Sequence, residues 1–355
     1  MNLRITRRVL LAMAAAIVLV GTVEAADPVK VGFVYVGSAT DNGWNYRHDH
    51  GRLAVEKAFG DKVKTTFVEN VAEGPDSERV IRQLAASGHK LIFTTSFGFM
   101  NATIRVAKRF PKVMFEHATG YQRTKNVSTY AARFYQGRAV IGTIAGHMSK
   151  TGVVGYIGSF PIPEVVRGIN AFALAAQKIN PDIKVRVVWV NTWTDPGKEA
   201  DAAKALIDQG VDIITQHTDT PAPLQVAQER GVFGFGQAAD MAKFAPNSQL
   251  TSIVDNWDPY YISRVDALLK GTWKSGDTWD GLKEGMVSMA AYSKDVPADV
   301  AAAADKIKKG IIDGSFHPFT GPIKNQKGEI VVKAGETISD GDLVKMDWYV
   351  QGVEN

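Results

Sequence analysis

Cysteine is absent from the whole sequence of 355 residues. Its absence excludes a disulfide framework, a thiolate metal site and a cysteine nucleophile. It also excludes a lipid-carrying cysteine after an N-terminal leader, so an anchored bacterial lipoprotein is ruled out.

Catalytic motifs are lacking as well. The sequence has no Gly-x-Ser-x-Gly, no Gly-x-x-x-x-Gly-Lys-Ser/Thr and no His-Glu-x-x-His. His48-Asp49-His50 falls in a predicted helix, where residues two apart point to different sides, so a solvated face is favoured over a metal site. Glu116 and His117 follow a predicted strand, and a structural hydrogen bond is favoured over an acid/base pair. We therefore predict a binding protein rather than an enzyme, without catalytic residues, metal or cofactor.

No charge sign is in large excess. The chain has 41 lysines and arginines against 37 aspartates and glutamates, a formal net charge of +4, and part of this excess lies in the first 25 residues. So small an excess gives little electrostatic reason for a nucleic-acid partner, and we predict none. The hydrophobic fraction of 45% is that of an ordinary globular protein, and the length allows two compact domains.

Long apolar runs are confined to the N-terminus. Residues 1–25 contain Arg4, Arg7 and Arg8, an apolar run over 9–20, and a small-x-Ala ending at Ala25. This order is typical of a cleaved export signal, and the run is too short for a membrane-spanning helix. Arg7 and Arg8 fit a twin-arginine signal as well as a general one, and we leave the two open. We predict a periplasmic protein released by removal of residues 1–25.

The rest of the chain alternates short apolar runs with amphipathic stretches. Strands are predicted at 31–36, 66–68, 91–93 and 113–115, and a similar series follows at 153–157, 185–190 and 211–214. Continuous apolar runs separated by helices are typical of parallel sheets covered on both faces. Asp195 with Pro196 predicts the start of one intervening helix.

This duplication predicts an α/β protein with two similar doubly wound parallel-sheet lobes and a ligand cleft between them. The last hundred residues are expected to pass between the lobes. We place the first lobe at 26–132 plus 256–283 and the second lobe at 133–255 plus 284–355.

Aromatic, amide and acidic side chains follow several predicted strands or mark the crossings between lobes. In parallel sheets ligands collect at the carboxyl ends of strands, and stacking faces with a few polar groups suit a planar heteroaromatic ligand or a sugar. Trp273 and Trp279, in a polar stretch, are expected to lie away from any strand end. The candidate ligand-binding residues are Trp44, Asn45, Phe97, Phe134, Tyr135, Trp193, Asp219, Gln237, Asp240, Asp255 and Trp257.

Several motifs in fixed order resemble those of the basic membrane protein family. They are Val29-Lys30-Val31-Gly32-Phe33-Val34, Asp41-Asn42-Gly43-Trp44-Asn45, Trp193-Thr194-Asp195-Pro196-Gly197-Lys198, Phe319-Thr320-Gly321-Pro322-Ile323 and Met346-Asp347-Trp348-Tyr349-Val350. The resemblance covers essentially the whole mature chain. It implies a type I periplasmic-binding-protein fold and a solute-binding component of an ABC importer, whose partners are a small ligand and a membrane permease. We expect a monomer.

The resemblance also suggests roles for individual residues. Nucleoside-binding members stack an aromatic residue on the base, which implies that role for Trp44 and an edge hydrogen bond from Asn45. An aromatic follows Arg133 where such members carry an acid, and Gln237 stands where they carry an aspartate, with Asp240 three residues further. These departures favour a free purine base, adenine-like, over a nucleoside.

Other functions stay open at this stage. The chain is alternatively a receptor for a purine nucleoside or a sugar, or a sensor that presents its liganded form to a membrane kinase. A secreted nucleoside hydrolase is disfavoured because no clustered carboxylates or nucleophile are evident.

Overall fold

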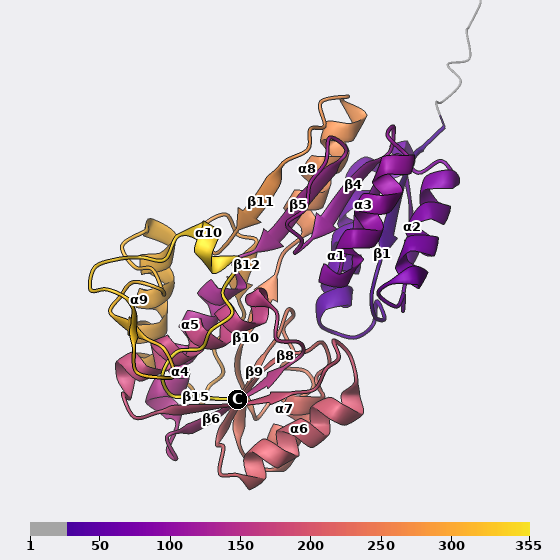
Figure 1. Ribbon diagram of the computed structural model, residues 1–355. Helices are drawn as coiled ribbons and strands as arrows, with labels where there is room; N and C mark the ends of the chain where they lie inside the picture. Colours follow the sequence, from indigo (N-terminus) through magenta and orange to yellow (C-terminus); the bar gives the residue numbers. More distant parts are fainter. Residues whose placement is uncertain (1–26) are drawn as a thin grey trace, which may run out of the picture.

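The computed structural model describes residues 27–355, and the predicted leader lies outside this range. The described chain forms two large sheets, each with its own helices, and Figure 1 shows the two groups one above the other. Within this range no helix is both long and apolar enough to cross a bilayer.

The first lobe is built on a six-stranded sheet whose paired strands all run parallel. The strand predicted at 31–36 lies two residues earlier, and the edge strand β11 was not predicted. In spatial order the strands are β11 (Asp277–Asp280), β5 (Val127–Ala132), β4 (Met114–Ala118), β3 (Leu91–Thr94), β1 (Val29–Val34) and β2 (Val63–Val68).

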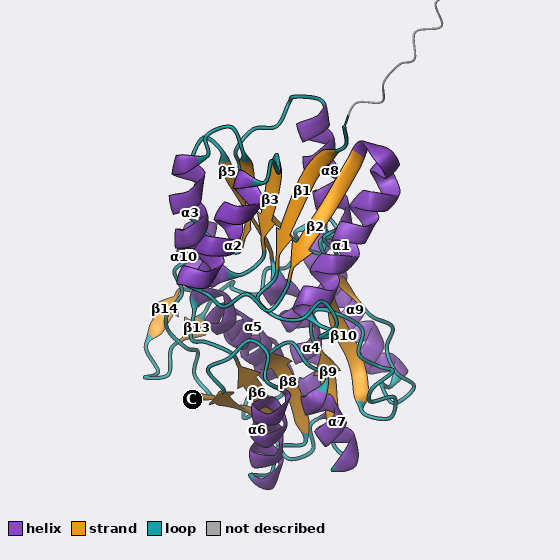
Figure 2. Cartoon of the chain, turned by 90° about the vertical axis from the view of Figure 1, so that its right-hand side faces the viewer, coloured by secondary structure: helices purple, strands orange, loops and turns teal. Residues whose placement is uncertain are grey.

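Helices lie on both sides of this sheet, as Figure 2 shows. One pair, α1 and α8, packs together, and so does the pair α2 and α3. The helical segments are α1 (Trp44–Phe59), η1 (Gly60–Lys62), α2 (Pro75–Ala86), η2 (Phe97–Phe99), α3 (Met100–Arg109) and α8 (Asp258–Leu269).

The second lobe is built on a seven-stranded sheet that is parallel except at one edge. There β12 pairs antiparallel with β10, after the chain has passed through α8 and β11 of the first lobe. In spatial order the strands are β12 (Val287–Met289), β10 (Gln249–Asp255), β9 (Phe233–Gly236), β8 (Ile213–His217), β6 (Val153–Gly158), β7 (Lys184–Trp189) and β15 (Val353–Glu354).

The helices of the second lobe also cover both sides of their sheet. The predicted helix start at Asp195 is confirmed, because the Asp195 carboxylate accepts the Lys198 N–H at 3.1 Å. The helices are α4 (Phe134–Met148), α5 (Pro163–Ile179), α6 (Pro196–Asp208), α7 (Ala222–Glu229), α9 (Ala298–Asp313) and α10 (Asp340–Leu343). A short antiparallel hairpin is formed by β13 (Ile323–Lys324) and β14 (Ile330–Val332).

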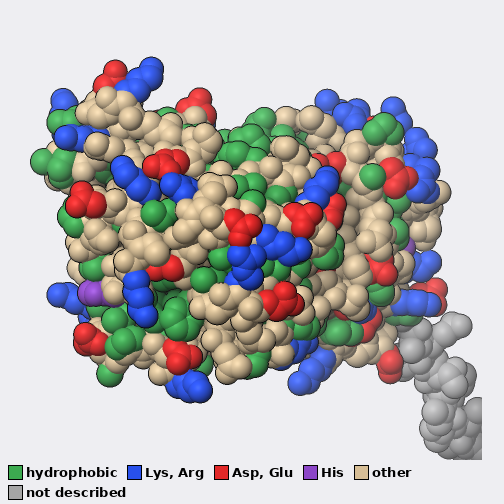
Figure 3. Space-filling model, turned by 90° about the horizontal axis from the view of Figure 1, so that it is seen from below, with side chains coloured by type: hydrophobic (Ala, Val, Ile, Leu, Met, Phe, Trp, Pro, Cys, Tyr) green, Lys and Arg blue, Asp and Glu red, His purple; other side chains and the backbone are tan. Residues whose placement is uncertain are grey.

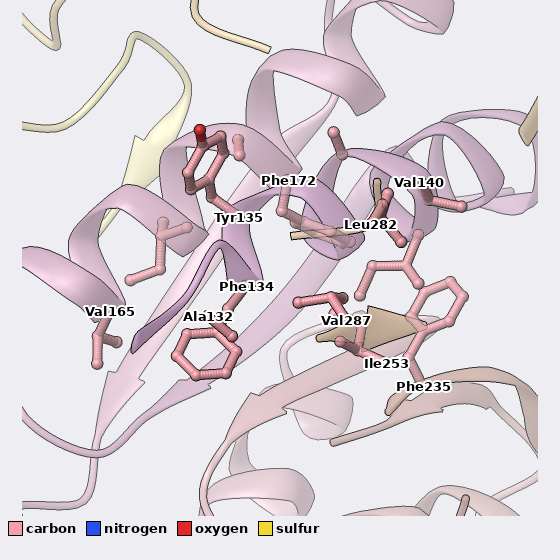
Figure 4. Packing of buried hydrophobic residues seen from close by; sticks show 14 of the residues in the cluster. Ala132, Phe134, Tyr135, Val140, Val165, Phe172, Phe235, Ile253, Leu282 and Val287 are labelled. Carbon is pink, nitrogen blue, oxygen red and sulfur yellow. The ribbon is translucent and has the colours of Figure 1, made fainter. Parts of the chain in front are cut away.

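The chain passes between the sheets after β5, after β10 and after β11. Buried side chains surround the first of these crossings (Figure 4), where Phe134 and Tyr135 begin α4 and their rings lie on opposite sides of the chain. On the face shown in Figure 3, basic and acidic side chains are interspersed, as the near balance of charges in the sequence suggests.

Candidate ligand-binding site

The carboxyl ends of strands from both lobes surround a hollow of about 350 Å³, which we call the pocket. This is the position at which ligands bind in open α/β sheets. The first lobe contributes Val36, Trp44, Ser96, Phe97 and Thr119, and the second contributes Glu164, Trp193, His217, Asp219 and Gln237.

Trp44 forms the aromatic wall contributed by α1. Its indole N–H donates to the Thr95 carbonyl oxygen at 2.6 Å, and its ring packs edge-on against His48 and Trp257, with centroids 4.3 and 5.5 Å away. The side chain is half-buried, so it is fixed from behind while it lines the pocket.

The turn before α1 explains why Trp44 is held there. The Asp41 carboxylate accepts the backbone N–H groups of Gly43, Asn45 and Tyr46 at 2.8 to 3.0 Å, which satisfies free donors at the helix start. It also accepts the side-chain amide of Asn45 at 2.7 Å. Asn45 is therefore buried in this turn rather than among the residues that line the pocket.

The second lobe supplies the opposing aromatic wall. Trp193 follows β7, packs against Phe160 with centroids 5.1 Å apart, and donates its indole N–H to Glu73 of the first lobe at 3.2 Å. Glu73 also accepts the Ser96 hydroxyl at 2.5 Å and the Gly98 N–H at 3.1 Å. One carboxylate thus holds Trp193 and both neighbours of Phe97.

Three polar groups of the second lobe follow strand ends in the pocket. Burial, reinforced by nearby carboxylates, raises the pKa of Asp219, which accepts the Thr194 hydroxyl at 2.9 Å. Burial lowers the pKa of His217, whose Nε2 lies 3.5 Å from the Glu164 carboxylate. Gln237 follows β9 and accepts a hydrogen bond from Arg138 through its side-chain oxygen. The pocket therefore combines flat apolar walls with a few fixed polar groups.

Five of the eleven sequence-predicted residues line the pocket, namely Trp44, Phe97, Trp193, Asp219 and Gln237. Phe134 and Trp257 lie one layer further out, with ring centroids 5.9 and 5.5 Å from that of Trp44.

The other predicted residues lie elsewhere. Tyr135 packs against Phe319 and Trp279 on the opposite side of the crossing. Asp240 is exposed and accepts the Gln249 amide at 2.7 Å. Asp255 is fully buried, burial raises the pKa of its carboxyl group, and neither carboxylate oxygen has a hydrogen-bond partner in the described chain.

The sequence interpretation missed five lining residues: Val36, Ser96, Thr119, Glu164 and His217. The signal was present, because His217 ends β8, Ser96 follows β3 and Thr119 follows β4. The sequence prediction covers aromatic, amide and acidic side chains, but not hydroxyl or imidazole groups. Applied to every polar residue after a strand, it finds these three as well.

Two expectations were wrong. His48 is not on a solvated face: it is fully buried, stacked on Trp257 and hydrogen-bonded to the Tyr261 hydroxyl at 2.5 Å. Trp279 is not remote from the strands, because it belongs to β11. It lines a second hollow of about 750 Å³ that shares Phe97, Thr119 and Glu164 with the pocket.

For Glu116 and His117 the structural interpretation is confirmed. Glu116 accepts from the Tyr260 hydroxyl at 2.7 Å and from the Trp273 indole at 2.6 Å, and His117 contacts the Thr94 hydroxyl at 2.9 Å. Both side chains therefore form hydrogen bonds with other residues of the first lobe.

The two lobes and the pocket between them define a solute-binding protein of the type I periplasmic-binding architecture. The family model described as "ABC transporter substrate-binding protein PnrA-like" matches residues 28–317. The chain therefore belongs to this family, which confirms its resemblance to the basic membrane protein family.

Individual relatives agree with this assignment. A purine-binding protein of Brucella abortus is 57% identical, with 97% of this chain and 98% of that protein covered. A Haloferax volcanii protein, whose name proposes glucose binding for an ABC transporter, is 36% identical over 94% of this chain and 82% of its own length. A solute-binding protein from Aeropyrum pernix, 20% identical, superposes with a TM-score of 0.72 over 89% of this chain and 95% of its own, which supports the fold alone.

Proposed function

We propose that this protein is the periplasmic receptor of an ABC importer and that it captures a purine base, adenine-like, between its lobes. The observation that carries the proposal is the pocket itself, in which Trp44 and Phe97 of one lobe and Trp193 of the other surround a small space. Aromatic faces from both sides suit a flat heteroaromatic ring, and such walls contribute stacking energy. The purine-binding relative at 57% identity supports the same ligand class.

The rest of the proposal follows from this role. The lobes at 26–132 plus 256–283 and 133–255 plus 284–355 hinge at the three crossings, and closure around the ligand creates the surface presented to a membrane permease. We propose export by the N-terminal leader, a monomeric state and no catalytic turnover.

Identification of the co-purified ligand tests the proposal. The purified protein is denatured and the released small molecules are identified by mass spectrometry. We expect a purine base, and a sugar or a nucleoside as the main released molecule would contradict the base assignment. Incubation with adenosine and inosine, followed by chromatography, tests turnover, and release of free base would contradict a binding-only role.

The proposal that the protein feeds an importer rather than a kinase has its own test. The liganded protein is presented to membranes that contain the permease and ATPase encoded beside its gene. Ligand-dependent ATP hydrolysis is the expected result. A neighbouring sensor kinase that responds to the liganded protein instead would support the sensory alternative.

A further inference from the structure

Arg138 is a fully buried guanidinium in α4 that makes no ion pair within the described chain. Its Nη1 donates to the Thr215 hydroxyl at 2.9 Å, and its Nη2 donates to the Gln216 carbonyl oxygen at 2.8 Å. The same Nη2 donates to the side-chain oxygen of Gln237. A buried charge is costly unless it is hydrogen-bonded. Here Nη1 and Nη2 hold residues at the ends of β8 and β9, whereas Nε has no partner within the described chain.

The chemistry of the guanidinium decides which way the Gln237 amide points. Arginine has only N–H donors, so the atom of Gln237 that faces Arg138 must be the amide oxygen. The amide nitrogen then lies on the other branch of the side chain, and in the described chain it has no protein acceptor. Gln237 lines the pocket, and an NH2 group without a protein acceptor is a donor that a ligand bound there can use.

We propose that Arg138 is a positioning residue that fixes Gln237 as a hydrogen-bond donor, so that the pocket selects a ligand with an acceptor atom at this point. This inference rests on the proposed function for its choice of ligand class. For a purine base the matching acceptor is an unprotonated ring nitrogen. Without Arg138 the amide could present either its oxygen or its nitrogen, and the selection would be lost.

His217 presents the complementary group. A proton on Nε2 can be donated toward Glu164, 3.5 Å away. Nδ1 is then a buried acceptor without a partner in the described chain. A donor from Gln237 and an acceptor from His217 in one pocket fit a heterocycle that carries both a bare ring nitrogen and an N–H group.

The binding test compares adenine with 1-, 3- and 7-deazaadenine, each of which replaces one ring nitrogen with C–H. Calorimetric titration of the wild-type protein is expected to show one analogue that binds about 5- to 150-fold more weakly, because a buried donor loses its acceptor. In Gln237→Leu this penalty disappears. In Gln249→Leu, a matched change at a buried glutamine outside the pocket, the penalty is retained.

Arg138→Met tests the positioning role. The discrimination between adenine and the penalised analogue is expected to shrink to within about threefold, whereas Arg138→Lys, which keeps a donor, restores part of it. A merely structural Arg138 would lower stability and leave this ratio unchanged in the folded protein. That result overturns the inference, as does equal binding of all three analogues to the wild-type protein. If Arg138→Met does not fold, the Gln237→Leu comparison decides.

A ligand-free measurement separates this inference from the proposed function. Denaturant unfolding of Arg138→Met, Gln237→Leu and the double variant forms a thermodynamic cycle, because each single change removes one partner of the buried hydrogen bond. We expect a non-additive effect. If no purine binds, the proposed function fails. The cycle still measures the interaction between Arg138 and Gln237, because it needs no ligand. Additive effects overturn the inference whatever the ligand proves to be.

Discussion

Among single residues, Trp44 links the pocket to the aromatic side chains packed behind it. Its indole N–H donates to the Thr95 carbonyl oxygen, and its ring packs edge-on against His48 and Trp257. The ring is therefore held in place before a ligand binds. Stacking of a base on an aromatic ring contributes about 1–3 kcal/mol. We therefore expect Trp44→Ala to weaken purine binding about 5- to 150-fold in calorimetric titrations of the folded variant.

Trp273 provides the control for this change. Its indole donates to buried Glu116 and it does not line the pocket. Trp273→Ala should reduce stability and leave affinity unchanged. Unaltered affinity in Trp44→Ala would remove the stacking role.

A second residue-scale prediction concerns pH. Burial lowers the pKa of His117 to about 3, and the contact with Thr94 opposes this shift only in part. Below pH about 6.5 the unfolded chain binds a proton at this position that the folded chain does not bind. The free energy of unfolding from this group therefore falls as the pH drops from about 6.5 toward 3, by about 1.4 kcal/mol per pH unit.

The His117→Asn variant isolates this contribution. Between pH 6 and pH 5 its free energy of unfolding should fall less steeply than that of the wild-type protein. The slopes should differ by up to about 1.4 kcal/mol per pH unit, which corresponds to one bound proton. Denaturant titrations at several pH values measure both slopes. Parallel slopes would show that His117 becomes protonated in the folded state.

At the scale of elements, the start of α1 meets the loop after β8 from the other lobe. A Cβ atom at Gly43 would lie 2.2 Å from the Asp219 carbonyl oxygen, so the two backbones approach closely only because residue 43 is glycine. Overpacking of this kind costs about 1–3 kcal/mol. The added Cβ would destabilise the arrangement in which the two lobes are in contact. Gly43→Ala should therefore weaken ligand binding about 5- to 150-fold.

Gly276→Ala is the matched control, because no heavy atom lies within 4 Å of its added Cβ. Affinity measured by titration, together with melting of each ligand-free variant, separates loss of closure from loss of folding. Equal affinities for the two variants would contradict a role of this contact in closure.

The loop between β2 and α2 carries two carboxylates with different neighbours. Glu73 bridges the lobes through Trp193, whereas Glu69 accepts the Ala39 N–H at 2.7 Å within the first lobe. A hydrogen bond contributes about 0.5–1.5 kcal/mol. We expect Glu73→Ala to speed ligand dissociation about 2- to 12-fold.

Glu69→Ala should leave the dissociation rate unchanged, because its contacts do not cross the cleft. Stopped-flow measurement of tryptophan fluorescence during ligand displacement provides both rates. A similar acceleration in the two variants would indicate a general effect of the loop rather than a link between aromatic walls.

For the whole molecule, a ligand that contacts both lobes couples binding to stability. A purine base at 100 times its dissociation constant should raise the free energy of unfolding by about 2.7 kcal/mol through mass action. Thermal melting in the presence of adenine, hypoxanthine and guanine measures this shift, and small-angle scattering should show a smaller radius of gyration. Unmoved melting curves with all three bases would contradict the purine assignment.

Much of the architecture follows from local sequence patterns. His48-Asp49-His50 lies in a helix, as predicted, and the Asp195 cap is where the sequence places it. Because parallel strands bring their carboxyl ends to one edge, the sequence alone predicts that residues as distant as Trp44, Trp193 and Gln237 line one pocket.

Long-range packing determined the rest. Strand β11 has no apolar run and exists because it adds to the edge of β5, about 150 residues away. His48 is buried because Tyr261 and Trp257 cover it. The sequence pattern of α1 alone does not predict a contact with residues of another segment. The direction of the Gln237 amide is set by Arg138, 99 positions earlier in the chain. The sequence determined which chemistry reaches the cleft, whereas burial and hydrogen bonding between distant segments decided how each group is presented there.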